Sequence, residues 1–315
     1  MIRASNRSRW ITGFLALSYA GFLGCNPPAG AQSAVYVHTA TAGNTATDLT
    51  LLDHSLLNNS PTSRLMVTQL WNPPGVPPVY NASPIQVFYS PLFLSWVVQN
   101  LDGSSPLGAS FFVYARKDYD ANAGILFVHR SSDANTSGNY THIDHDALNG
   151  NPAAITQVTA LLSSSVENPH PIGLWYDSNA NRWGVFNQDL AAMPVDSKFF
   201  ICAGNCAATF DVESHYLHTA TDLNSSGEST HSDLTDPDLL LLVSPIWTAP
   251  GQLTGVYNDH PTGVWYDPLL DDWAVFNEDE ADMPLGAHFH IFATRVIYEN
   301  GFEHGLLTGW SAVFP

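Results

Sequence analysis

Basic residues are scarce in this sequence. Its 315 residues include 10 Lys and Arg against 29 Asp and Glu, which gives a formal net charge of −19 at pH 7. Residues 211–282 contain fifteen acidic residues and neither Lys nor Arg. A surface of this sign repels phosphate backbones and anionic lipids. The composition therefore argues against nucleic acid as a partner, whereas divalent cations and basic proteins remain compatible with it.

Long apolar segments are also lacking. The apolar run at residues 11–24 follows three arginines and has fourteen residues, too few to span a bilayer but typical of a signal peptide. We expect residues 1–31 to be a signal peptide, cleaved after an A-x-A site at its end. Lipoprotein processing at Cys25 is the alternative. Both predict export to a secreted or cell-surface location, without a transmembrane helix.

Cysteine is rare, with three residues in the chain. Export would remove or lipidate Cys25, which leaves Cys202 and Cys206 in the segment CAGNC. In an oxidising compartment, two nearby cysteines favour a local disulfide. A redox or metal pair is the alternative, but the C-x-x-x-C spacing differs from C-x-x-C and no second pair completes a zinc site.

Three copies of one pattern organise the chain. His38, His129 and His218 are each followed by Asn after six residues, Thr after twelve and Asp after fifteen. A second block recurs at residues 96–115, 183–203 and 273–293. We therefore predict repeat 1 (34–115, divergent), repeat 2 (126–203), repeat 3 (215–294) and a C-terminal tail (295–315).

Each repeat has the composition of a β domain. Short aromatic and β-branched runs such as FFVYA and WAVFN are bounded by Asn, Asp, Pro and Gly. Residues 170–194 and 260–284 share 14 of 25 positions and read as a hairpin with a variable turn. The sequence predicts five or six strands per repeat and an all-β protein of three tandem homologous sandwich-like or small-barrel domains.

The full motif in repeats 2 and 3 is H-P-x-G-x-W-Y-D…W-x-V-F-N-x-D-x-x-x-M-P. It resembles a repeat domain of unknown function found in secreted bacterial proteins, over about 260 of the 315 residues. Repeat 1 departs from the motif, with Ser83-Pro84 in place of His-Pro. The resemblance implies a fold and an exported location but no reaction. The tail is similar to N-G-F-E-x-G…G-W-S endings in other exported bacterial proteins, which implies a sorting or attachment segment.

Histidines and aspartates at matched positions in repeats 2 and 3 raise a metal hypothesis. Three histidines suit zinc, and Asp-rich and Asn-rich loops suit calcium. Repeat 1 keeps only His38, however, and histidines that bond the backbone at strand ends would explain the pattern equally. We expect no cofactor and retain zinc or calcium as the alternative, with these candidate ligands: His129, His142, Asp144, His170, His218, His231, Asp233 and His260.

Recurring aromatic residues raise a carbohydrate hypothesis. Trp175, Tyr176, Trp265 and Tyr266 lie next to Asp and Asn, a combination suited to stacking sugars and bonding their hydroxyls. Packing in small β cores is the alternative for these rings.

Catalytic motifs are not evident. The chain lacks G-x-S-x-G and H-E-x-x-H, and the acidic run at 277–282 reads as a solvated face rather than a carboxylate pair across a cleft. We therefore predict a non-catalytic exported repeat protein that acts in surface adhesion, ligand binding or cell-envelope structure, with a glycan or a cell-surface protein as partner. The alternatives are a secreted metal-dependent hydrolase and a lectin-like carbohydrate-binding protein.

Overall fold

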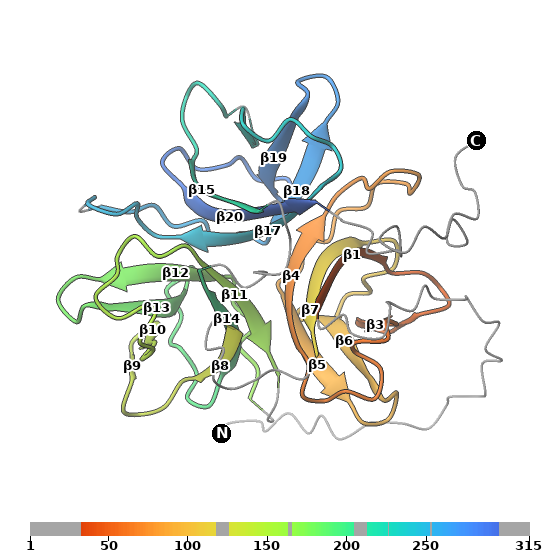
Figure 1. Ribbon diagram of the computed structural model, residues 1–315, viewed down its shortest axis with the longest axis horizontal. Helices are drawn as coiled ribbons and strands as arrows, with labels where there is room; N and C mark the ends of the chain where they lie inside the picture. The colour runs from red at the N-terminus through yellow and green to blue at the C-terminus, as the bar shows by residue number, and fades with distance from the viewer. Residues whose placement is uncertain are drawn as a thin grey trace, which may run out of the picture.

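The computed structural model describes residues 33–117, 126–162, 166–204, 213–225, 227–252 and 254–295. These ranges contain twenty β-strands and no α-helix, which confirms the all-β prediction, and accordingly none of their segments is a helix that could span a membrane. Three lobes surround a common centre (Figure 1). The predicted signal peptide and residues 296–315 of the predicted tail lie outside the described ranges.

Each repeat divides into two half-sheets of antiparallel strands. We call the three strands that hold the long apolar runs the core half-sheet, and the strands around the duplicated hairpin the hairpin half-sheet. In repeat 1 the core half-sheet is β1 (Ser33–Thr39), β7 (Ser110–Arg116) and β4 (Arg64–Leu70), and the hairpin half-sheet is β5 (Ile85–Ser90), β6 (Ser95–Asn100), β3 (Leu49–Leu52) and β2 (Thr45–Ala46).

Repeats 2 and 3 have the same plan, with six or seven strands per repeat when the two-residue strands are counted. In repeat 2 the core half-sheet is β8 (Leu126–Arg130), β14 (Lys198–Ala203) and β11 (Thr156–Leu161), and the hairpin half-sheet is β12 (Ile172–Asp177), β13 (Arg182–Asn187), β10 (Tyr140–His142) and β9 (Thr136–Ser137). In repeat 3 the core half-sheet is β15 (Glu213–Thr219), β20 (His288–Arg295) and β17 (Leu239–Ile246). Its hairpin half-sheet is β18 (Thr262–Asp267), β19 (Asp272–Asn277) and β16 (Ser229–His231).

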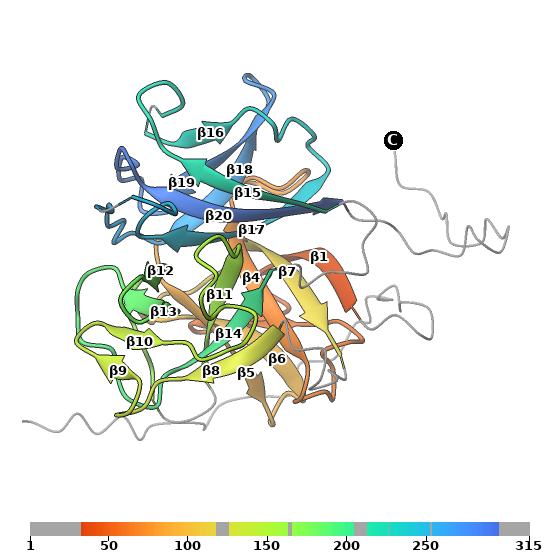
Figure 2. The ribbon, with the colours of Figure 1, turned by 60° about the vertical axis from the view of Figure 1, so that its left-hand side comes forward.

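The three sheets of the protein are each shared between two repeats. The hairpin half-sheet of one repeat joins the core half-sheet of the next through a short parallel pairing: β5 with β11, β12 with β17, and β18 with β4. We call these contacts joint 1–2, joint 2–3 and joint 3–1. Because the third repeat joins the first, the repeats close into a ring, whose central strands β4, β11 and β17 converge in both views (Figures 1 and 2).

The duplicated sequence forms the predicted hairpins. In β12 and β13, Ile172 pairs with Asn187 and Asp177 with Arg182; in β18 and β19, Thr262 pairs with Asn277. Both second strands are buried after their first residue, as expected for runs with apolar side chains on both faces. The invariant motif residues therefore build a strand pair that carries a joint on its outer edge.

The hydrophobic core crosses the repeat boundaries, and one buried cluster includes residues of all three repeats. The tryptophan at the second position of β6, β13 and β19 packs on the core half-sheet of the next repeat in the ring. Its indole N–H donates to a loop carbonyl in its own repeat at 2.8–2.9 Å. The three ring pairs, with centroid distances of 5.4–5.6 Å, are Trp96–Phe200, Trp183–His290 and Trp273–Phe112.

Candidate functional site

One hydrogen-bond relay recurs at the anchor histidine of every repeat. His129 Nε2 lies 2.9 Å from Thr141 Oγ1, and that hydroxyl donates to Asn135 Oδ1 at 3.1 Å. Burial lowers the pKa of all three anchor histidines to about 4, so they are neutral near pH 7. The relay links the core half-sheet of a repeat to its hairpin half-sheet. Its other copies are His38–Thr50–Asn44 and His218–Ser229–Asn224.

In repeat 3, the hydroxyl residue of the relay differs from the one that the sequence spacing predicts. Thr230 was expected to match Thr50 and Thr141, but Ser229 occupies that place. Ser229 pairs with Val275 as Thr141 pairs with Val185. The loop after Asn224 is one residue shorter than its counterparts, so the strand begins one residue earlier. His231 is consequently not the counterpart of His142.

The two histidines have different surroundings. His142 Nε2 lies 3.1 Å from Asp177 Oδ2, and its ring stacks 5.7 Å from that of Trp175. The ring of His231 lies 4.7 Å from that of Tyr216 and 5.2 Å from that of His218. His231 thus packs against strand β15, whereas His142 faces the end of β12.

The histidines of the two His-Pro turns form paired contacts with aspartate. His170 Nδ1 lies 2.5 Å from Asp189 Oδ2, and His260 Nδ1 lies 2.6 Å from Asp279 Oδ2. In repeat 1, Ser83 takes this place, and its hydroxyl accepts the backbone N–H of Asp102 at 3.2 Å. Each pair therefore braces the segment before the hairpin against the turn that follows it.

The acidic loop candidates are held by polar neighbours. Asp144 accepts Asn149 Nδ2 at 2.9 Å and pairs with Arg182 at 2.9 Å, and these contacts lower the pKa of its carboxyl. The backbone N–H of Asp233 donates to His231 Nδ1 at 3.3 Å. Within the described ranges, no three His, Cys, Asp or Glu side chains converge as metal ligands. The structure therefore does not bring the predicted ligand set together.

The acidic run at 277–282 is only partly a solvated face. Asp279 and Glu280 are exposed, but Glu278 is 2% exposed and accepts the backbone N–H of Asn81 in repeat 1 at 2.9 Å. Burial raises the pKa of Glu278 to about 8, and the hydrogen bond from Asn81 opposes this rise. A residue expected on the surface thus lies inside joint 3–1.

The four predicted stacking residues are partly buried and in contact with other side chains. Tyr176 and Tyr266 pack edge-on against Trp183 and Trp273, at 5.6 and 5.7 Å. Trp175 packs edge-on against Tyr140 at 4.8 Å, and the indole N–H of Trp265 donates to Glu228. These rings belong to the scaffold of the hairpin half-sheets and to its contacts.

Two aromatic clusters at the joints were not predicted from the sequence. At joint 3–1, the ring of Tyr80 stacks 5.3 Å from that of Trp71, and Trp71 packs edge-on against Trp265 at 5.2 Å. At joint 2–3, Tyr257 lies 6.0 Å from Trp247 and 5.9 Å from Phe186. Tyr80 is 44% exposed and Tyr257 41%. The signal for both was the shared segment W-x-x-P-G…V-Y-N at 71–81 and 247–258.

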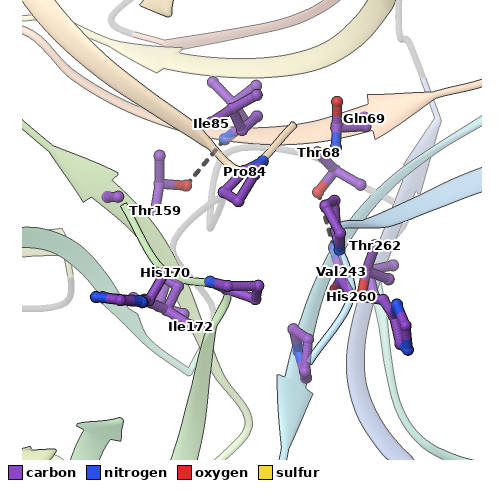
Figure 3. A pocket seen from close by; sticks show the side chains of 16 residues that line it. Thr68, Gln69, Pro84, Ile85, Thr159, His170, Ile172, Val243, His260 and Thr262 are labelled. Atoms are coloured by element: carbon purple, nitrogen blue, oxygen red, sulfur yellow. Dashed lines mark hydrogen bonds between the residues drawn. The ribbon is translucent and has the colours of Figure 1, made fainter. Parts of the chain in front are cut away.

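A small pocket lies where the three repeats meet (Figure 3). Its volume of about 90 Å³ is well below the 300–1,000 Å³ of a typical small-molecule site. His170 and His260 lie on opposite sides of it, and Pro84, Pro171 and Pro261 line it in equivalent places. The pocket can hold a few water molecules rather than a sugar.

Three equivalent hydrogen bonds run around this centre. Each backbone N–H of a valine on one central strand donates to a hydroxyl on the next: Val67 to Thr159, Val158 to Ser244 and Val243 to Thr68, at 2.9–3.1 Å. The polar groups beside the pocket are therefore used to hold the central strands together.

The cysteine predictions remain predictions. Cys202 is buried at the end of β14, whereas Cys206 and Cys25 lie outside the described residues. The proposed disulfide and the proposed lipidation consequently have no structural test.

Fold and contacts together define an all-β repeat protein, in which three sandwich-like copies share their sheets around a ring. The chain belongs to the family described as domain of unknown function DUF7452, whose model matches residues 28–104, 93–203 and 173–293. Each later match begins inside the hairpin half-sheet of the preceding repeat. Searches of curated proteins and of solved structures give no match.

Proposed function

We propose that this is an exported, non-catalytic repeat protein that acts in surface adhesion, ligand binding or cell-envelope structure. One observation carries the proposal: the polar residues shared by the repeats are used in contacts that hold the fold together. The anchor histidines are at most 7% exposed and bond a hydroxyl inside their own repeat. A general acid or base must instead reach a substrate proton.

The arrangement of the repeats also supports a binding or structural role. Three lobes, one for each repeat, surround a common centre (Figure 1). Linked copies of a weak binding surface gain avidity without new contacts, provided that the geometry lets them engage together. Export is supported by the apolar run after the N-terminal arginines.

The proposal can be tested in the organism that makes the protein. The protein should be recovered from the medium or the cell surface, with residues 1–31 removed or Cys25 lipidated. The purified protein should then bind isolated cell envelopes in a saturable way. Recovery of the unprocessed chain from the cytoplasm, or no envelope binding at any concentration tested, would contradict the proposal.

Lectin-like carbohydrate binding is a second candidate, and the exposed rings of Tyr80 and Tyr257 favour it. An aromatic ring with one apolar face and a polar edge is suited to stacking a sugar. We expect hits on a glycan array to weaken at least tenfold in the variant Tyr80→Ala/Tyr257→Ala. The variant Leu223→Ala, at a 98% exposed position, is the matched control. Absence of hits, or equal binding by both variants, would reject carbohydrate binding.

A further inference from the structure

Glu278 is the buried end of a contact between the first and third repeats. It directly follows β19, and its Oε2 accepts the N–H of Asn81, in the loop after β4. Its backbone N–H donates to Pro261 O at 2.8 Å, which fixes the residue at the base of the hairpin. Gly263 on the paired strand lies against the carboxyl, and a Cβ at that position would clash with Oε1. The site is therefore shaped around this side chain.

The residue at the position of Glu278 differs among the three joints. The residue after the hairpin Asn is Leu101 in repeat 1, Gln188 in repeat 2 and Glu278 in repeat 3. Gln188 repeats the geometry of Glu278 at joint 2–3, where its Oε1 accepts the N–H of Asn258 at 3.0 Å. A neutral amide thus performs in one joint what a carboxyl group performs in another. Joint 3–1 carries the ionisable version.

No basic side chain of the neighbouring sequence compensates a charge on Glu278. Residues 65–115 and 211–282 contain neither Lys nor Arg. The Tyr80 phenol, on the loop that holds Asn81, lies in the field of Glu278 and of two further acids, Glu228 from the segment before β16 and Glu280 from the turn after β19. The field of Glu280, Glu278 and Glu228 adds to desolvation in raising the pKa of Tyr80. His260 beside the joint is paired with Asp279.

We propose that Glu278 is a pH-sensitive latch that closes joint 3–1 when protonated and loosens it when ionised. A buried carboxylate without a counterion is costly, and the chain can relieve that cost by admitting water between the loop of Asn81 and β19. Joints 1–2 and 2–3 have Leu101 and Gln188 in this place and do not respond. The ring therefore opens at one of its three joints, between its first and last repeats.

The sign follows from burial. The folded protein holds the Glu278 proton to about pH 8, whereas an unfolded chain releases it near the ordinary pKa of a glutamate. The stabilisation of the protonated joint is complete below that ordinary value and is lost as pH rises through about 8. The latch is therefore closed in mildly acidic conditions and open in alkaline ones.

The test is amide hydrogen exchange of the full chain between pH 6 and 10, corrected for the intrinsic pH dependence of exchange. Peptides that contain Asn81 should lose protection by up to tenfold per pH unit from pH 6 to about 8 and level off above it, while peptides that contain Asn258 stay protected. Glu278→Gln should abolish the transition, since it copies Gln188. Gln188→Glu should create a transition at Asn258. Tyr80→Phe should leave the midpoint unchanged, which separates the latch from ionisation of the phenol.

Two outcomes would overturn the proposal. One is an unchanged transition at Asn81 in Glu278→Gln, and the other is simultaneous loss of protection at Asn81 and Asn258 in the natural protein. If Gln188→Glu fails to fold, Glu278→Gln still decides the question, because its side chain already fits the equivalent joint.

Discussion

Single buried side chains set how this protein responds to acid. His38, His129, His218 and His290 lie inside the described core, and burial lowers the pKa of each to about 4. The unfolded chain binds protons on these rings near their ordinary pKa of 6.5. Their contribution to stability is present above pH 6.5 and is lost as the pH falls through about 4.

His290→Phe tests this coupling, because Phe112 and Phe200 occupy the same place in the other repeats. We expect the free energy of unfolding of the variant to fall less steeply between pH 6.5 and 4, by up to about 1.4 kcal/mol per pH unit. Urea unfolding at several pH values measures the slope. Stability at pH 7 should drop, because Thr156 loses the bond from its N–H to His290 Nδ1. An unchanged slope would contradict the assignment.

The sequence anticipated the repeat of these residues but not all of their roles. The spacing of His, Asn and Thr marked a recurring contact, in which the anchor histidines bond a side-chain hydroxyl rather than the backbone. Thr230 was misassigned because Ser229 and Thr230 are adjacent hydroxyl residues and the loop before them is one residue shorter. The burial of Glu278 was not predicted, because no local pattern shows that the next repeat in the ring covers a residue in an acidic run.

At the scale of an element, the tip of each hairpin requires the left-handed backbone region. Asn181 and Asp271 adopt φ values of 53° and 59° there, and Leu94 adopts 52° in repeat 1. Asn and Asp tolerate this conformation because their short polar side chains bond the local backbone, whereas leucine is strained in it. The variable turn is thus constrained in conformation although it is free in sequence.

Leu94→Asn should therefore stabilise the protein by about 0.5–1 kcal/mol. Leu94 is 51% exposed, so the substitution sacrifices little apolar burial. The measurement is the urea midpoint, with Leu92→Asn as the control, because Leu92 is 65% exposed and does not adopt a positive φ. Equal effects of the two substitutions would show that surface polarity, and not backbone strain, is responsible.

Strands and hairpins were predictable because their signals are local. Aromatic and β-branched runs marked β12, β13, β18 and β19, and their pairing needs only a short turn. The sharing of sheets was not predictable, because each joint is a parallel pairing of one or two residue pairs. The same edge sequence could meet its own repeat or another copy, and internal similarity does not distinguish these cases.

At the scale of the molecule, a repeat on its own leaves two complementary edges open. In repeat 3, β17 would lose β12 and β18 would lose β4. Open, apolar strand edges promote association, and head-to-tail contacts close into a ring when the rotation between copies permits it. In this protein, three repeats are enough to close the ring.

A fragment of residues 213–295 should therefore assemble into a trimer at micromolar concentrations, with each copy supplying both sides of a joint. Glu278 of one copy would accept the N–H of Asn258 of another, as Gln188 does in the natural chain. Sedimentation equilibrium measures the mass, and circular dichroism checks the β content. A folded, stable monomer would contradict the prediction. Gly263→Ala, which crowds Glu278, should weaken the trimer.

The three joints do not depend on which repeat comes first in the chain. The connections from β7 to β8 and from β14 to β15 each have nine residues, 117–125 and 204–212. A third connection of similar length, from the end of β20 to the start of β1, would complete a circular chain with every joint retained. Genes that begin at repeat 2 or at repeat 3 and keep the cyclic order of the copies would then encode the same ring, because each joint would still form between the same two repeats.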